Sequence, residues 1–205
     1  MTHPHLLPDV DRHRGVERTL FGRRSTKRFA DRRLTLDDAA GALWSVAGTT
    51  RDGHRVCPSA RASYPVTATL VAAEVEGLGT GVYAYDPARH AVDTVQTGDH
   101  RRRVAEVTLD AVDWLATCPA AIVLSADMVA AGERFPDQPA EHGEVFVWIE
   151  VGHAAQNLYL WAAEHRLGTA LIAGLDDARA AAYCTDLLPH EHRVLGILPI
   201  GQPTT

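Results

Sequence analysis

Apolar residues recur along this chain with two different periods, and the switches between them predict the order of its elements. Spacings of three and four residues are typical of amphipathic helices, and alternating β-branched runs are typical of half-buried strands. The predicted helices span residues 12–24, 36–47, 99–116, 145–167 and 177–187. The predicted strands span residues 66–75, 82–85, 91–95, 120–126, 171–175 and 194–200.

Two of the predicted helices carry extra signals. Thr35 stands just before residues 36–47 and Asp38 follows three residues later, a pattern that predicts a capping box. Residues 145–167 are apolar most of the way round, which predicts a helix buried in a core or against a second subunit. Residues 130–143 are polar and rich in breakers, so we expect a loop or lid there, at the substrate entrance.

The order of the elements predicts an α+β fold, with helices first and then a mainly antiparallel sheet with inserted helices. A length of 205 residues fits one domain, so we expect a flexible N-terminal arm over residues 1–11 and one domain over residues 12–205. Three distant cysteines, Cys57, Cys118 and Cys184, predict reduced thiols in a cytoplasmic protein. No uninterrupted apolar run approaches 18 residues, so we expect no membrane span.

The charge is unevenly distributed. The formal net charge is -6, yet residues 1–61 hold 12 Lys and Arg against 7 Asp and Glu. A basic segment on an acidic protein predicts a bound anion, whereas a nucleic-acid partner would require a basic face throughout. The densest basic run begins at Arg23 and includes Lys27, the one lysine of the chain. Guanidinium groups, hydroxyls and an ammonium lie within five residues there, a set that suits phosphate oxygens.

Other patterns predict weaker chemistry. Gly77–Gly81 superficially matches a dinucleotide-binding loop, but a strand and a turn follow it where that motif needs a helix. The histidine pairs at residues 3 and 5 and at residues 190 and 192 lack the rigid spacing of a metal site. Ser59 has no defined base partner, so nucleophilic catalysis is weakly supported.

Four segments, in order, resemble the nitroreductase-like flavoprotein superfamily, and in particular its SagB-type branch of thiazole- and oxazole-forming dehydrogenases. The segments are Arg23–Phe29, Pro58–Pro65, Glu150–Leu158 and Ile172–Asp177. The stretch at residues 77–90 is also similar to that branch. The resemblance implies an intertwined homodimer with two FMN sites at the subunit interface, and residues 152–160 in its central helix.

The resemblance also implies a role for each matching residue. The phosphate, ribityl chain and pyrimidine edge of FMN would be held by Arg23, Arg24, Ser25 and Lys27. The isoalloxazine ring would be met from the partner subunit by Pro58, Ser59 and Arg61. Flavin N5 and O4 would face the backbone N–H groups near Ala173 and Gly174. A cation beside N1 and O2 stabilises the reduced flavin, and Lys27 is our candidate for it.

The chain departs from the branch at three places. The Lys-Tyr pair thought to deprotonate the azoline ring is replaced by Gln138 and Pro139, which puts azoline aromatisation in doubt. Arg61 stands where glycine is usual, and would narrow the space above the flavin or pair with an anionic substrate. Gln202 replaces the arginine of a common Gly-Arg-Pro and removes one phosphate contact.

These features favour an FMN-dependent oxidoreductase that acts by hydride transfer at flavin N5. Its substrate would be a small-molecule or a carrier- or peptide-bound biosynthetic intermediate. One alternative is a NAD(P)H-dependent nitro or quinone reductase. Another, from a different class, is a non-catalytic scaffold that has kept the dimeric fold and lost turnover.

Overall fold

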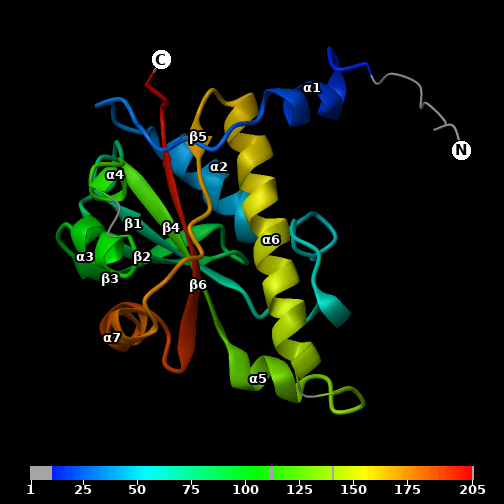
Figure 1. The fold of residues 1–205 in the computed structure, drawn as a ribbon. Helices are drawn as coiled ribbons and strands as arrows, with labels where there is room; N and C mark the ends of the chain where they lie inside the picture. Colours follow the sequence, from blue (N-terminus) through cyan, green and yellow to red (C-terminus); the bar gives the residue numbers. More distant parts are fainter. Residues whose placement is uncertain (1–10, 111–112, 140, 205) are drawn as a thin grey trace, which may run out of the picture.

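A computed structural model describes residues 11–110, 113–139 and 141–204, so residues 1–10 of the predicted arm lie outside it. A six-stranded antiparallel sheet runs through the molecule in the order β3-β2-β1-β4-β6-β5 (Figure 1). Its strands are β1 (Thr67–Ala72), β2 (Gly81–Asp86), β3 (Ala91–Thr97), β4 (Ala120–Asp127), β5 (Gly168–Thr169) and β6 (His192–Gly201). The predicted α+β class is confirmed.

Helices cover both faces of this sheet. They are α1 (Gly15–Gly22), α2 (Leu36–Ala47), α3 (Arg101–Glu106), α4 (Asp113–Ala116), α5 (Met128–Glu133), α6 (Glu141–Glu164) and α7 (Asp177–Leu187). A 3-10 turn, η1, spans Ala60–Ala62. Figure 1 shows α2 and α6 on one side of the sheet and α3, α4 and α7 on the other. In the described part, no helix combines the length and apolar character needed to cross a bilayer.

The molecule has two hydrophobic cores, one on each face of the sheet, and side chains of the central strand β4 lie in both. Ile122 and Leu124 pack with α2 and α6, whereas the alternating residues Ala121 and Val123 pack with α3, α4 and α7. This alternation follows from the period of two in a strand. Because both faces of β4 are covered, the strand is apolar at nearly every position. Its packing against α6 holds in place the helix that carries part of the candidate site.

Several predicted elements are confirmed. The helix at residues 36–47 matches α2, and its capping box is present: Thr35 Oγ1 accepts from Asp38 N at 3.0 Å and Asp38 Oδ2 accepts from Thr35 N at 3.1 Å. The glycine run at residues 77–81 forms the turn between β1 and β2, with Gly77 at φ +75°. That position rules out a dinucleotide-binding loop, as its sequence context predicts.

The predicted helix at residues 99–116 is wrong in its middle. The chain leaves α3 at Glu106 because residues 107–109 bond to a distant segment. Leu109 N donates to Gly174 O at 3.0 Å, and Asp176 N donates to Val107 O at 2.8 Å. The competing backbone hydrogen bonds therefore outweigh the local helical pattern.

Four further elements differ from the prediction. The loop expected at residues 130–143 begins as α5, because Asp127 Oδ1 accepts from Ala130 N at 2.9 Å and caps that helix. Residues 171–175 form no strand; they make only single bridges, Ile172 to Ile197 and Leu175 to Thr108. The first predicted helix, residues 12–24, is shorter at both ends and spans Gly15–Gly22. The longest, residues 145–167, begins and ends earlier than predicted and spans Glu141–Glu164.

Two of the three cysteines can be placed. Cys57 and Cys118 are buried and free, and burial raises the pKa of each thiol to about 12. Both thiols therefore stay protonated at neutral pH and are poor nucleophiles. The side chain of Cys184 lies outside the described part.

Candidate functional site

The basic run of residues 23–28 lies in an extended segment beside the chain that leaves α6. Ser25 forms a parallel bridge with Thr169, and Thr26 N donates to Thr169 O at 2.9 Å. The chain reaches this position because α6 ends in a left-handed turn at Arg166, φ +58°, where Leu167 N donates to Ala162 O at 2.8 Å. Residues 23–28 and 168–174 thus form the two sides of one candidate site.

Tyr159, on α6, joins these two sides. The Arg23 guanidinium lies over its ring, 5.1 Å from the centroid. Its hydroxyl oxygen lies 3.3 Å from Ser25 Oγ and accepts from Leu171 N at 2.8 Å. Sequence reasoning missed Tyr159, because its partners are distant along the chain and no local pattern distinguishes it from a buried aromatic residue.

A cavity of about 220 Å³ brings Lys27 together with the backbone of Ala173 and Gly174. Thr108, Asp110 and Trp114 complete much of its wall. Within the described residues, the N–H groups of Ala173 and Gly174 make no backbone hydrogen bond, and both residues are exposed. The cavity therefore offers one cation and two unused donors to a ligand.

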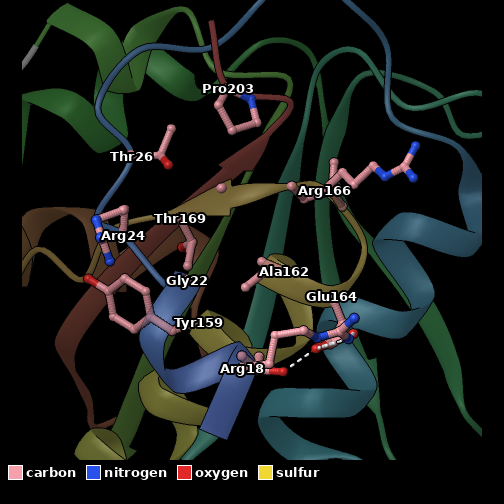
Figure 2. A pocket seen from close by; sticks show the side chains of 14 residues that line it. Arg18, Gly22, Arg24, Thr26, Tyr159, Ala162, Glu164, Arg166, Thr169 and Pro203 are labelled. Atoms are coloured by element: carbon pink, nitrogen blue, oxygen red, sulfur yellow. Dashed lines mark hydrogen bonds and ion pairs between the residues drawn. The ribbon is translucent and has the colours of Figure 1, made fainter. Parts of the chain in front are cut away.

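A larger cavity, of about 690 Å³, has Arg24, Thr26 and Tyr159 in its wall (Figure 2). Its charged lining consists of three arginines, Arg18, Arg24 and Arg166, and one carboxylate, Glu164. Thr19 Oγ1 hydrogen-bonds to Glu164, and Arg18 Nη2 lies 2.7 Å from it; these contacts lower the pKa of that carboxyl. The remaining positive charge suits an anion.

A buried hydroxyl also faces this region without a partner. Thr169 lines the larger cavity and is 1% exposed, and its Oγ1 has no hydrogen-bond partner in the described part. Burying such a hydroxyl unpaired is unfavourable, which points to a polar ligand atom.

No carboxylate among the described residues forms an ion pair with Arg23, Arg24 or Lys27.

The second predicted group lies elsewhere in this chain. Pro58, Ser59 and Arg61 belong to a loop next to the first half of α6. Ser59 Oγ accepts from Tyr64 N at 2.9 Å, and Arg61 Nη2 lies 2.7 Å from Asp137 Oδ2. This ion pair lowers the pKa of Asp137.

Glu150, on α6, fixes the base of that loop. Its side chain is 5% exposed, and Oε1 accepts from Val66 N at 3.3 Å. Burial raises its pKa, and a hydrogen bond from Ser59 opposes that rise. Cys57 Sγ donates to the Glu150 carbonyl at 3.4 Å. The carboxyl therefore holds Ser59 and the start of β1 against α6.

The two groups lie on opposite sides of α6. Tyr159 contacts the first group and Glu150 the second, and nine residues correspond to two and a half turns, or about 14 Å of rise. One chain therefore does not bring Pro58, Ser59 and Arg61 to Lys27.

Gln138 and Gln202, two positions at which the chain differs from the branch it resembles, have partners within this chain. Gln138 Oε1 lies 3.2 Å from His142 Nδ1, and Gln202 Oε1 accepts from Arg32 Nη1 at 3.0 Å. His192 Nδ1 lies 3.1 Å from Ser125 Oγ, a contact that accounts for it structurally. In the part of the chain that the structure describes, no three His, Cys, Asp or Glu side chains are grouped as metal ligands.

Known proteins are similar over nearly the whole chain. The model of the nitroreductase family matches residues 20–202. A candidate nitroreductase of Methanocaldococcus jannaschii is 29% identical over 197 residues, 96% of this chain and 94% of that protein.

Two solved structures share the fold. A candidate nitroreductase from Ralstonia eutropha JMP134 has a TM-score of 0.75 at 24% identity, over 97% of this chain and 89% of that one. A chain of the E. coli microcin synthetase McbBCD complex with truncated pro-MccB17 bound has a TM-score of 0.74 at 19% identity. That match covers 98% of this chain and 76% of the other. At these identities, both matches bear on the fold alone.

Proposed function

Because this chain belongs to the nitroreductase family, whose members are oxidoreductases, we propose that it is an FMN-dependent enzyme acting by two-electron transfer. Its substrate would be a small-molecule or a carrier- or peptide-bound biosynthetic intermediate. The observation that carries the proposal is the cavity shared by Lys27, Ala173 and Gly174. FMN, when bound, supplies hydride transfer at its N5 atom.

The residues of this cavity have complementary tasks. The Lys27 ammonium would stabilise negative charge on the pyrimidine edge of the ring. The free N–H groups of Ala173 and Gly174 would donate to the N5 and O4 side and orient the ring. A side chain at Gly174 would approach only Leu109, at 3.7 Å, so the backbone stays accessible to a flat ligand.

The polar end of FMN has fitting partners in the adjoining segment. Arg23, Arg24 and Ser25 would bind the phosphate and ribityl chain, with guanidinium forks and a hydroxyl that suit phosphate oxygens. The unpartnered Thr169 hydroxyl adds a donor or acceptor there. The excess of arginines around the larger cavity supports an anionic occupant.

We further propose that the active form is a homodimer formed through α6. Val145, Trp148 and Ile149 are 49%, 39% and 49% exposed on one side of this helix. Nothing lies within 4 Å of where a Cβ of Gly152 would stand, so a second helix can approach closely there. A second copy would bring its Pro58, Ser59 and Arg61 to the ring, since the chain's own loop lies across α6.

The type of reaction that we propose within the family rests on Gln138 and Pro139. Neither residue supplies a base where the SagB-type branch carries its Lys-Tyr pair. We therefore propose two-electron chemistry on an intermediate of the kind that branch handles, without azoline aromatisation.

An absorbance spectrum of the purified protein tests the cofactor. A flavin band that survives gel filtration supports the proposal, whereas a colourless protein that binds no added FMN overturns it. Anaerobic mixing with NADPH then separates two forms of the enzyme. Rapid bleaching identifies a NAD(P)H-driven reductase, and a stable yellow colour identifies a dehydrogenase reduced by its own substrate.

A further inference from the structure

The loop around Arg61 has an unfavourable backbone conformation. φ is +52° at Arg61, +51° at Ala62 and +47° at Tyr64, in the left-handed region that favours glycine. Each such residue destabilises the fold, and it persists only where the surroundings fix it. Such residues are concentrated at ligand clamps and active sites, so this loop is a candidate for function.

The base of this loop is held firmly. Ser59 accepts two backbone N–H groups, that of Ala62 at its carbonyl (3.1 Å) and that of Tyr64 at its hydroxyl (2.9 Å). Ser59 also bonds to the buried Glu150, and the Arg55 guanidinium lies 5.7 Å from the centre of the Tyr64 ring. These contacts keep the strained turn in place.

The Arg61 side chain contacts a buried aromatic ring and forms an ion pair with an exposed carboxylate. Its guanidinium lies over the ring of the buried Phe135, 5.2 Å from the centroid, and Phe135 in turn packs on Phe146 at 4.8 Å. Its ion pair with Asp137 joins two side chains that are 51% and 61% exposed. An exposed ion pair contributes little to stability, so another carboxylate can replace Asp137.

We infer that Arg61 binds a carboxylate of the substrate, and that Asp137 forms an ion pair with the Arg61 guanidinium while no substrate is bound. A guanidinium fork matches a carboxylate in geometry and charge. Asp137 already bonds to one nitrogen of this fork, Nη2. The inference rests on the proposed function, because the dimer is what places this loop against the flavin of the partner subunit. It names the substrate class: organic acids.

Two matched electron acceptors test this. Photoreduced FMN-loaded protein is mixed anaerobically with 4-nitrobenzoate or with 4-nitrobenzamide, and flavin reoxidation is followed by stopped-flow absorbance. The two compounds share the nitro group and differ in the carboxylate. The quantity measured is the ratio of the benzoate rate to the benzamide rate, in wild type, Arg61→Gly, Asp137→Asn and Arg89→Gln. Glycine suits the backbone at residue 61, and Arg89 forms its ion pairs with Asp86 and Asp93, away from this loop.

Arg61→Gly is expected to lower the ratio about ten- to a hundredfold, the usual effect of losing a hydrogen bond to a charged group. Asp137→Asn is expected to raise the ratio, because the competing carboxylate is gone, and Arg89→Gln to leave it unchanged. An equal ratio in wild type and Arg61→Gly overturns the inference. Failure of the proposed function is seen separately, because a protein without a flavin band gives no reoxidation signal for any variant.

Discussion

The Tyr159 hydroxyl lies 3.3 Å from the Ser25 hydroxyl and accepts the Leu171 N–H at 2.8 Å. One side chain of α6 thereby fixes the spacing between the basic segment and the segment that ends at Gly174. The spacing of the two sides of the candidate site therefore depends on Tyr159 as well as on the bridge between Ser25 and Thr169.

Tyr159→Phe removes this link. The half-buried Leu171 N–H loses its acceptor, so we expect the free energy of unfolding to fall by about 1–3 kcal/mol and FMN to bind more weakly. Urea unfolding and FMN titration measure the two effects. Tyr83→Phe is the control, since its hydroxyl donates to Gly79 in the β1–β2 turn, at 2.7 Å. Unchanged FMN affinity in Tyr159→Phe would show that the link does not position the site.

Lys27→Gln tests the cation of the smaller cavity. Losing the ammonium should make the reduced flavin less stable and shift its midpoint potential to more negative values, while Lys27→Arg should restore much of the shift. Spectroscopic redox titration provides the comparison. Arg28→Gln, at the next cation along the chain, should alter the potential far less. Equal shifts for the two glutamine variants would contradict the role of Lys27.

Ile149→Glu tests the proposed subunit interface. Ile149 is exposed in the single chain, so the fold should tolerate glutamate, but a charge buried between two α6 helices should separate the subunits. Light scattering should then report a monomer, and the flavin should be lost with the partner's loop. Val129→Glu is the matched control, because Val129 is 70% exposed on α5. A flavin-bound dimer in Ile149→Glu would contradict this interface.

Glu150 should impose a pH dependence on stability. Burial raises its pKa above the ordinary 4.5, so its contribution is fully present below that pH and is lost as the pH rises through the raised pKa. Glu150→Gln stays neutral and keeps an acceptor for Val66 N–H, so it should gain stability over wild type as the pH rises. Urea unfolding of both proteins between about pH 4.5 and 8 measures this difference.

Glu164→Gln should show the opposite trend. Thr19 and Arg18 lower the pKa of Glu164, so the advantage of wild type is present above pH 4.5 and is lost as the pH falls through the lowered value. A pH-independent difference in either variant would contradict the assigned pKa direction.

The fold was largely predictable where local signals decide it. The Thr35–Asp38 capping box predicts the start of α2 at Leu36, and the apolar run at residues 120–126 predicts a buried strand where β4 lies. The errors arise where distant backbone groups compete with local pattern. Leu109 and Gly174 bond across 65 residues and interrupt the helix expected at residues 99–116, and no local spacing signals that contact.

The candidate site was predictable only in part, for the same reason. The basic run and the Ala173–Gly174 segment are visible as patterns, and the structure brings Lys27 to that segment. Tyr159 and Thr169 contribute through contacts between distant segments, so their sequence neighbourhood gives no indication of them. The flavin roles of all these residues stay predictions.

Native mass spectrometry tests the central claim most directly, because it counts chains and flavins in one complex. We predict a species of two chains that carries two FMN molecules, and a loss of both flavins when Ile149→Glu separates the chains. A monomer that holds FMN, or a dimer that takes up none when FMN is added, would contradict a flavin site built between two copies of this chain.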